Sequence, residues 1–326
     1  MPRAGPCRPV GSAAVDDVTR AARAYVGVEM GGTKCVCLRG TGPEDIRDRA
    51  TIPTADPQTT LAAIGTVLDG WRATHGAPAA IGVASFGPLH LEPGEPRYGQ
   101  IGTTPKPGWA GVDLASFYRA RARAPLGLTT DVNGAALAEG RWGSARGLAD
   151  FAYVTVGTGV GVGLIVGGRY ALGARHPELG HVRIARLPGD TWPGVCRFHG
   201  DCVEGLASGP AIQARSGVDP AELPPDSPIW NPVAHALAQL AHVLVVSVAP
   251  RRILIGGGVV AGQRHLFQRV RRLLTQSLNG YIDSAELAAG LDEFIVPPGL
   301  GTLAGPLGAL ALAADAYATE PVDKAQ

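Results

Sequence analysis

The chain has 326 residues, of which 45% are hydrophobic and 17% are charged, a composition typical of a soluble globular protein. That length exceeds what one simple core accommodates and fits two lobes. The formal net charge is only +1, so nothing in the charge points to nucleic acid or to an acidic membrane surface as a partner.

The N-terminal segment, residues 1–24, holds Pro, Gly, Ala and Arg with little periodicity, and we expect a flexible extension outside the fold. It has no apolar core segment of the kind a secretory signal needs. Five cysteines, an odd and sparse number, argue against a disulfide framework and favour a reducing compartment. The longest apolar run, 236–249, is too short to span a bilayer. We therefore expect a cytoplasmic protein.

The fold is expected to start with two short strands, 26–29 and 35–38, on either side of a glycine turn. Cys35 and Cys37 fall on one face of the second strand, where core packing is their expected role. The pattern then predicts a helix over 59–75, a buried strand over 80–85, a loop rich in Gly and Pro over 87–112, a helix over 114–123, a strand over 126–130 and a helix from 133.

The opening pattern recurs further along the chain, with strands 151–156 and 160–166 around a second glycine turn. The two turns lie roughly 126 residues apart (31 and 157), which predicts an internal structural duplication. After it we expect an irregular segment over 174–210, a Pro-rich loop over 219–230, a helix over 234–249, a strand over 252–255, a basic amphipathic helix over 263–278, a short strand over 293–296 and a closing helix over 306–318.

The first glycine turn is Glu29-Met30-Gly31-Gly32-Thr33-Lys34. Glycines let a backbone approach phosphate closely, and the exposed amides supply hydrogen-bond donors. A carboxylate just before such a turn, Glu29, suits Mg²⁺ held through water. An ordinary hairpin explains the same short motif equally well.

The second glycine turn begins Gly157-Thr158-Gly159 and superficially suggests a dinucleotide site. However, Val162 and Leu164 stand where the third glycine of G-x-G-x-x-G would fall, and a strand follows instead of a helix. The chain also lacks the G-K-[S/T] of a Walker A loop. These observations disfavour a dinucleotide-dependent oxidoreductase and favour phosphate-contacting hairpins of another type.

Asp131 stands where a predicted strand ends and a helix begins, a location that aims a carboxylate into a cleft. A helix cap is the alternative, because Asp is a favoured N-cap residue. Its position between two phosphate-type turns favours a catalytic role.

Four residues form a candidate metal site: His181, Cys196, His199 and Cys202. The C-x₂-H-x₂-C spacing with one further His offers the four ligands of a closed, tetrahedral, structural Zn²⁺ site. Two free thiols beside surface histidines are the alternative, and the tight spacing favours the metal.

Glu178 and His181 flank a turn, and a carboxylate with an imidazole is typical of sugar-hydroxyl recognition. If zinc holds one His181 nitrogen, the other nitrogen is fixed for a second partner. On spacing alone, Glu178 is better explained as a solvated loop residue.

The order of these motifs resembles the ROK family of sugar kinases, in its bacterial fructokinase-like branch. The resemblance covers about residues 25–318 and includes five motifs: 29–34, 84–88, 104–109, 130–139 and 157–210. It implies an α/β, actin/hexokinase-like (ribonuclease H-like) fold, duplicated in two lobes around an interlobe cleft. The lobes would be 25–132, completed by a closing helix over 305–318, and 133–304, which carries a zinc loop over 176–204.

The resemblance also implies Mg²⁺ with ATP, a structural Zn²⁺ on the four residues named above, and a sugar as acceptor. The family's catalytic aspartate, the general base, falls on Asp131. Its sugar-binding positions fall on Lys106, Thr130, Glu178, His181 and Glu204. Its nucleotide-binding positions fall on Gly31, Gly32, Thr33, Lys34, Gly157, Thr158, Gly159, Pro210, Gly256, Gly257 and Gly258.

Two departures concern the sugar. Many ROK glucokinases have Asn where Thr130 stands, and many have a C-x-C-x₄-C zinc loop; both departures resemble the fructokinase branch and favour fructose. Glucokinase, mannokinase or N-acetylhexosamine kinase activity and a non-catalytic sugar sensor are the alternatives. The first 24 residues are too short and too rich in Pro for the helix-turn-helix of ROK repressors, and the family suggests a homodimer.

Overall fold

The computed structural model describes residues 24–282, 284–288 and 290–319. The expected N-terminal extension lies outside the described residues, except for Ala24.

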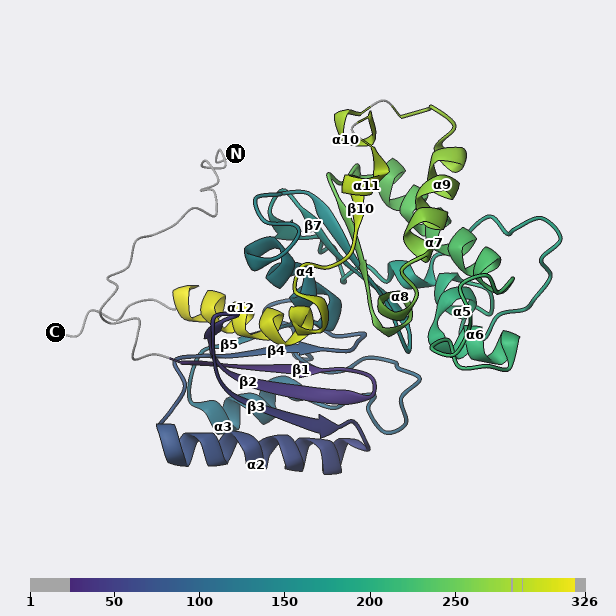
Figure 1. The fold of residues 1–326 in the computed structure, drawn as a ribbon. Coiled ribbons are helices and arrows are strands. Elements are labelled where there is room, and N and C mark those ends of the chain that lie inside the picture. Colours follow the sequence, from purple (N-terminus) through teal and green to yellow (C-terminus); the bar gives the residue numbers. More distant parts are fainter. Residues whose placement is uncertain (1–23, 283, 289, 320–326) are drawn as a thin grey trace.

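Two five-stranded sheets of the same topology form the frame of the molecule (Figure 1). The first has the order β3-β2-β1-β4-β5, and the second has the order β10-β9-β6-β7-β8. In each, three antiparallel strands form a meander, and two further strands run parallel to the first. The strands of the first sheet are β1 (Tyr25–Met30), β2 (Lys34–Gly42), β3 (Asp45–Pro53), β4 (Ile81–Ser85) and β5 (Leu126–Thr130). Those of the second are β6 (Phe151–Val156), β7 (Val160–Val166), β8 (Arg169–Tyr170), β9 (Ile253–Gly256) and β10 (Ile295–Val296).

The two faces of the first sheet are covered by different helices (Figure 1). On one face, Val26, Val28 and Met30 of β1 join a buried cluster with residues of α2 (Pro57–His75) and α3 (Leu114–Ala122). The alternation of a strand sends the residues between them to the other face, which α12 (Ala304–Thr319) covers. There Gly27 is required, since a Cβ on it would lie 2.6 Å from the backbone nitrogen of Leu310.

Cys35 and Cys37 on β2 are fully buried in the cluster beneath α2 and α3, which confirms their predicted role in the core. Burial raises the pKa of both thiols, that of Cys37 to about 12, so both stay protonated and unreactive at neutral pH.

Helix α12 also packs against α4 (Asp131–Trp142), and this pair joins the two halves (Figure 1). The helices touch at Gly134 and Gly308, where a Cβ on Gly308 would overlap the carbonyl of Gly134. Because α12 covers β1, β2, β4 and β5 although it comes last in the chain, its packing supports the proposal that it completes an N-terminal lobe over 25–132.

The second sheet packs against α4 and shares a buried cluster with a long apolar helix, α7 (Trp230–Val248), which itself packs on α9 (Leu266–Leu278). At 19 residues, α7 is longer than the apolar run in the sequence and is long and apolar enough to cross a membrane by length and composition. Its residues Leu237, Leu240 and Leu244 are buried in the core, as in the central helix of a globular protein. The remaining helical segments are η1 (Leu179–His181), α5 (Val203–Ala207), α6 (Gly209–Ser216), α8 (Gly258–Gly262), α10 (Ala285–Ala288), α11 (Leu291–Phe294) and η2 (Gly301–Leu303).

Several parts of the fold differ from the sequence predictions, among them short elements such as β8 and α8. Strand β3 was not predicted, because as an edge strand it alternates charged outward residues with few buried ones. The segment 174–210 is less irregular than expected, since it contains η1, α5 and the start of α6. The last strand begins at Ile295 and not at residue 293, because 291–294 is helical.

Candidate active site

The two glycine turns occupy equivalent positions in the two sheets and touch each other. The first joins β1 to β2, and the second joins β6 to β7. A Cβ on Gly32 would lie 2.8 Å from the hydroxyl oxygen of Thr158, so the Thr158 side chain of the second turn lies against Gly32 of the first. The sequence prediction of two related hairpins therefore extends to contact between them.

The first turn is held in place by the end of β3. Gly31 donates its N–H to the carbonyl of Lys34 (3.0 Å), and the hydroxyl of Thr54 donates to the carbonyl of Gly31 (2.9 Å). Thr54 also donates its own N–H to the carbonyl of Thr33 (2.9 Å). These bonds fix the backbone from both strands, as a phosphate cradle requires.

The second turn gathers the starts of two helices. Gly209 donates its N–H to the carbonyl of Gly157 (2.7 Å), which places the N-terminus of α6 against the turn. Gly257 has a φ of 93° and would overlap Val156 if it carried a Cβ, so α8 starts beside the same turn. The exposed N–H groups and the dipole of a helix N-terminus favour phosphate.

The structure corrects one detail here, since residues 208–210 form a helix start and not a turn. Ser208 is the N-cap of α6 and accepts the N–H of Ala211 (3.3 Å), and Pro210 stands in the first helical turn. The predicted nucleotide-binding residues Gly157, Pro210 and Gly257 thus come together in space.

Asp131 is the first residue of α4, at the carboxyl end of β5. The N-cap is Thr130, whose buried hydroxyl accepts the N–H of Asn133 (3.3 Å), so the interpretation of Asp131 as the helix cap is wrong. Burial raises the pKa of Asp131 to about 6, opposed by the N–H of Val132 (2.9 Å from Oδ1) and by Lys106. A carboxylate with such a pKa is suited to accept a proton near neutral pH.

Glu29, the carboxylate before the first turn, lies on the face of β1 that α12 covers. A Cβ on Gly305, in the first turn of α12, would overlap its carboxylate. Burial and the nearby charge of Asp131 together raise the pKa of Glu29 to about 7, so the two carboxyl groups are neighbours. Paired carboxylates beside a phosphate cradle are a donor set that fits Mg²⁺.

Lys106 reaches the first turn from the loop that follows β4. Its Nζ donates to the carbonyl of Gly32 (2.9 Å) and lies 4.9 Å from the ring centroid of Phe86. Burial lowers the pKa of Lys106, and Asp131 raises it. The ammonium group thus stands between the glycine turns and Asp131, whereas its predicted contact with the sugar stays a prediction.

The four predicted zinc ligands lie together, with their ligand atoms within 4.8 Å of one another. His181 Nδ1 lies 3.6 Å from Cys196 Sγ and 3.5 Å from Cys202 Sγ, and His199 Nδ1 lies 3.6 Å from Cys196 Sγ. Tetrahedral zinc with bonds of about 2.0 to 2.3 Å separates its ligands by roughly 3.3 to 3.8 Å. The geometry therefore fits a closed Zn²⁺ site.

Glu204 on α5 connects this Cys/His cluster to the second glycine turn. Its Oε1 lies 3.9 Å from His181 Nε2, the nitrogen that faces away from the cysteines. Its Oε2 accepts the N–H of Val160 (3.1 Å). The structure thus supplies the second partner that the sequence predicts for His181, although the distance is too long for a hydrogen bond.

Comparison with known proteins decides the family. The model of the ROK family matches residues 25–316. The chain belongs to the ROK family. It is 42% identical over 286 residues to a fructokinase from Pediococcus pentosaceus, covering 88% of this chain and 96% of that protein. It is 40% identical over 294 residues to a putative fructokinase from Bacillus subtilis (strain 168), covering 90% and 96%.

A solved structure of a ROK protein has a similar fold. The crystal structure of a ROK hexokinase from Thermus thermophilus superposes with a TM-score of 0.70 at 26% identity, covering 89% of this chain and 98% of that one. The predictions of a ROK sugar kinase and of a duplicated actin/hexokinase-like fold are confirmed.

In this ROK kinase, Glu178 faces the same site as Asp131. Burial, together with the charges of Asp131 and Glu204, raises the pKa of Glu178 to about 7. The Glu178 side chain is 47% exposed, so it is solvated, as the alternative from the sequence holds, and it faces these two acidic groups as well. One neighbour, His176, was not assigned from the sequence: it is buried, and its Nδ1 lies 3.5 Å from Glu178 Oε1. The only sign of His176 in the sequence is its position two residues before Glu178, a candidate sugar-binding carboxylate.

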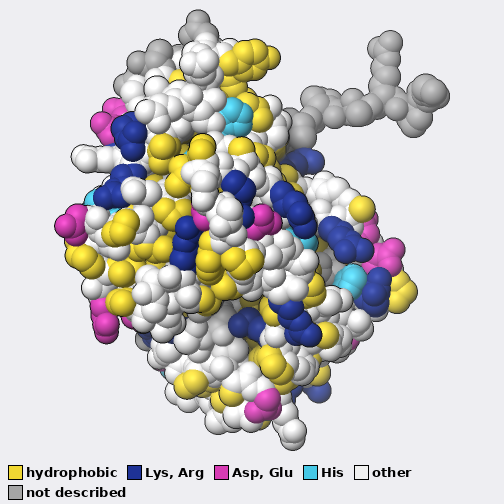
Figure 2. Space-filling model, turned by 90° about the vertical axis from the view of Figure 1, so that its right-hand side faces the viewer, with side chains coloured by type: hydrophobic (Ala, Val, Ile, Leu, Met, Phe, Trp, Pro, Cys, Tyr) yellow, Lys and Arg dark blue, Asp and Glu magenta, His cyan; other side chains and the backbone are white. Residues whose placement is uncertain are grey.

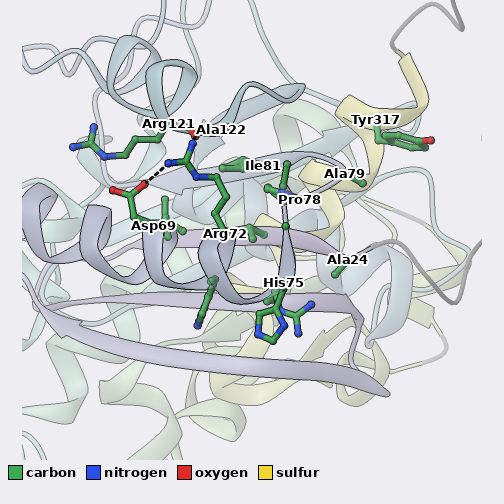
Figure 3. Close-up of a pocket in the computed structure, with 16 residues that line it drawn as sticks. Ala24, Asp69, Arg72, His75, Pro78, Ala79, Ile81, Arg121, Ala122 and Tyr317 are labelled. Carbon is green, nitrogen blue, oxygen red and sulfur yellow. Dashed lines mark hydrogen bonds and ion pairs between the residues drawn. The ribbon is translucent and has the colours of Figure 1, made fainter.

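Figure 2 looks at the molecule from the side on which β1 ends and α5 and α6 lie, and it shows a hollow in the lower half of this face with basic side chains at its edge. A separate cavity of about 240 Å³ lies at the opposite end of the first sheet, where β1 and β4 begin (Figure 3). There Arg72 is engaged by Asp69 (3.5 Å) and by the carbonyl of Arg121 (3.4 Å). No predicted site residue of the ROK family lines that cavity.

Proposed function

We propose that the protein transfers the γ-phosphoryl group of ATP to the 6-hydroxyl of a hexose, D-fructose first, and produces fructose 6-phosphate. The observation that carries this proposal is the place of Asp131 beside two glycine turns that touch. The similarity to fructokinases at 42% and 40% identity over most of the chain supports fructose as the sugar.

The nucleotide's phosphates would lie against the two glycine turns and the N-termini of α6 and α8, where backbone N–H groups and helix dipoles attract anions. Mg²⁺ would be held near Glu29, through water, and when bound it neutralises charge on the β- and γ-phosphates. Asp131 would accept the proton of the attacking hydroxyl, and Lys106 would lie beside the group in transfer. Catalysis of this kind depends mainly on positioning and on charge stabilisation.

The sugar would be held by Glu178, His181 and Glu204, with Thr130 beneath it. A Zn²⁺ ion on the Cys/His cluster would fix the ring of His181 by its Nδ1 and leave Nε2 toward Glu204. The zinc would thus be structural and would order one wall of the sugar site. A homodimer and a cytoplasmic location remain proposals, which the family membership supports.

The test is an ADP-release assay with Asp131→Asn. We expect turnover of fructose to fall by at least about 10²-fold, the usual range for loss of a general base, while fructose binding measured by calorimetry stays near that of the wild type. Near-normal turnover of the variant would remove Asp131 from the mechanism. Screening the wild type with fructose, glucose, mannose and N-acetylated hexosamines ranks the sugars, and sugar binding without ADP release would indicate a sensor.

A further inference from the structure

We propose that His176 is a positioning residue for the sugar, which holds the carboxyl group of Glu178 in one orientation and couples it to the loop after β4. The inference rests on the proposed function, since it gives a role to a residue beside the sugar site. His176 is 7% exposed; its Nε2 accepts a hydrogen bond, and its Nδ1 lies 3.5 Å from a carboxylate oxygen of Glu178.

The first contact fixes the state of the ring. The backbone N–H of Leu89 donates to Nε2 of His176 (3.0 Å, buried), so Nε2 is an acceptor and the ring proton is on Nδ1. Burial also lowers the pKa of His176, which keeps the ring neutral at the pH of the cytoplasm. Nδ1 with its proton then faces Oε1 of Glu178 at 3.5 Å.

The second contact limits where Glu178 can move. A Cβ on Gly87 would lie at van der Waals distance from both Cε1 of His176 (3.4 Å) and Oε1 of Glu178 (3.6 Å), so the backbone of Gly87 borders the pair on one side. With Oε1 directed to the imidazole, Oε2 of Glu178 is the oxygen left to receive a sugar hydroxyl. A carboxylate held in this way discriminates between hydroxyl patterns, because a misplaced acceptor leaves buried polar groups unpaired.

The third point is that Leu89 belongs to the other half of the molecule. It follows β4 of the first sheet, forms a bridge with Ile101 and is buried, and Gly102 donates its N–H to the carbonyl of Pro88 (2.7 Å). The same loop carries Lys106. His176 therefore ties the segment that presents Glu178, from the second half, to the loop that presents Lys106, from the first.

Two substitutions separate the two contacts. His176→Gln keeps an acceptor near the position of Nε2 for Leu89 but removes the donor toward Glu178. His176→Asn keeps a donor near the position of Nδ1 but removes the acceptor for Leu89. For His176→Gln we expect a Tm close to that of the wild type, a KM for fructose raised by about tenfold or more, and an unchanged KM for ATP. For His176→Asn we expect a lower Tm with a smaller change in the fructose KM.

A double-mutant cycle shows whether His176 acts through Glu178. In a Glu178→Ala background, His176→Gln should change the fructose KM by less than about twofold, because the carboxylate that it orients is gone. A folded His176→Gln variant with the wild-type fructose KM would overturn the inference, and so would an undiminished effect in the Glu178→Ala background. If His176→Gln does not fold, the cycle is run under the same criteria with His176→Leu, which also removes the donor toward Glu178. Failure of the proposed function would show separately, as a wild type that releases no ADP with any hexose.

Discussion

Replacing Lys106 by Met tests which substrate this ammonium group serves. Met keeps an apolar stem over Phe86 and removes the charge that lies 2.9 Å from the carbonyl of Gly32. A unit charge about 4 Å from a phosphoryl oxygen contributes about 4 kcal/mol at an effective dielectric constant of about 20. Lys106 is only partly buried, so solvent screening reduces this to about 2 to 3 kcal/mol. We therefore expect kcat to fall by roughly 30- to 150-fold.

The assay is steady-state ADP release with fructose and ATP varied separately. A charge that acts on the group in transfer lowers kcat and leaves the fructose KM within about threefold of the wild type, and Lys106→Arg should restore part of kcat. Arg97→Met is a matched control, because it removes an exposed cation from the same loop. A variant with normal kcat and a raised fructose KM would refute the phosphoryl role and support the sugar contact predicted from the sequence.

Three further predictions concern pH, metal and packing. Activity should rise with pH between about 5 and 7, because Asp131 (pKa about 6) and Glu29 (pKa about 7) act as anions, and a flat pH–rate profile would contradict this. Both pKa values exceed those of the unfolded chain, so the folded protein binds more protons in this window, and the unfolding free energy should fall as the pH rises through it. Elemental analysis should find about one Zn per chain, and Cys196→Ser should lose the metal and lower Tm, whereas a metal-free sample that is folded and fully active would refute the site. Gly308→Ala should lower the free energy of unfolding, measured by urea denaturation, by more than about 2 kcal/mol, because its Cβ would overlap Gly134. As a control, Gly70→Ala in α2, where a Cβ meets open space, should raise it by about 0.5 to 1 kcal/mol.

The duplicated frame was predictable from the sequence because it depends on local patterns. Apolar runs around Gly31 and Gly157 specify hairpins, and their repetition specifies two sheets of one topology. Strand β3 was missed because an edge strand exposes most of its side chains, which leaves little hydrophobic alternation to detect.

The site was predictable as a set of residues but not as a set of contacts. Asp131 was singled out by its place after a strand, yet the sequence does not show that Thr130 supplies the cap and frees the carboxylate. His176 gave a weak signal, because its partner Leu89 is 87 positions away and approaches through a backbone N–H group, which leaves no trace in the identity of the residue. Contacts between the halves depend on how α4 and α12 cross, and no local pattern encodes that crossing.

The two halves share a topology but differ in charge, and this difference places the chemistry. Glu29 stands two residues before the first glycine turn, whereas the neutral Thr155 stands two residues before the second. Asp131 opens α4 after β5, whereas α12, which follows β10, has no acidic residue in its first turn. We therefore propose that Glu29 and Asp131 face the attacking hydroxyl and a metal ion, and that the neutral second turn and the helix N-termini beside it face the phosphates. On this proposal, like charges would keep the phosphates away from the carboxylates unless a cation lies between them, and the reaction would be confined to the junction of the two turns, where Lys106 contacts Gly32.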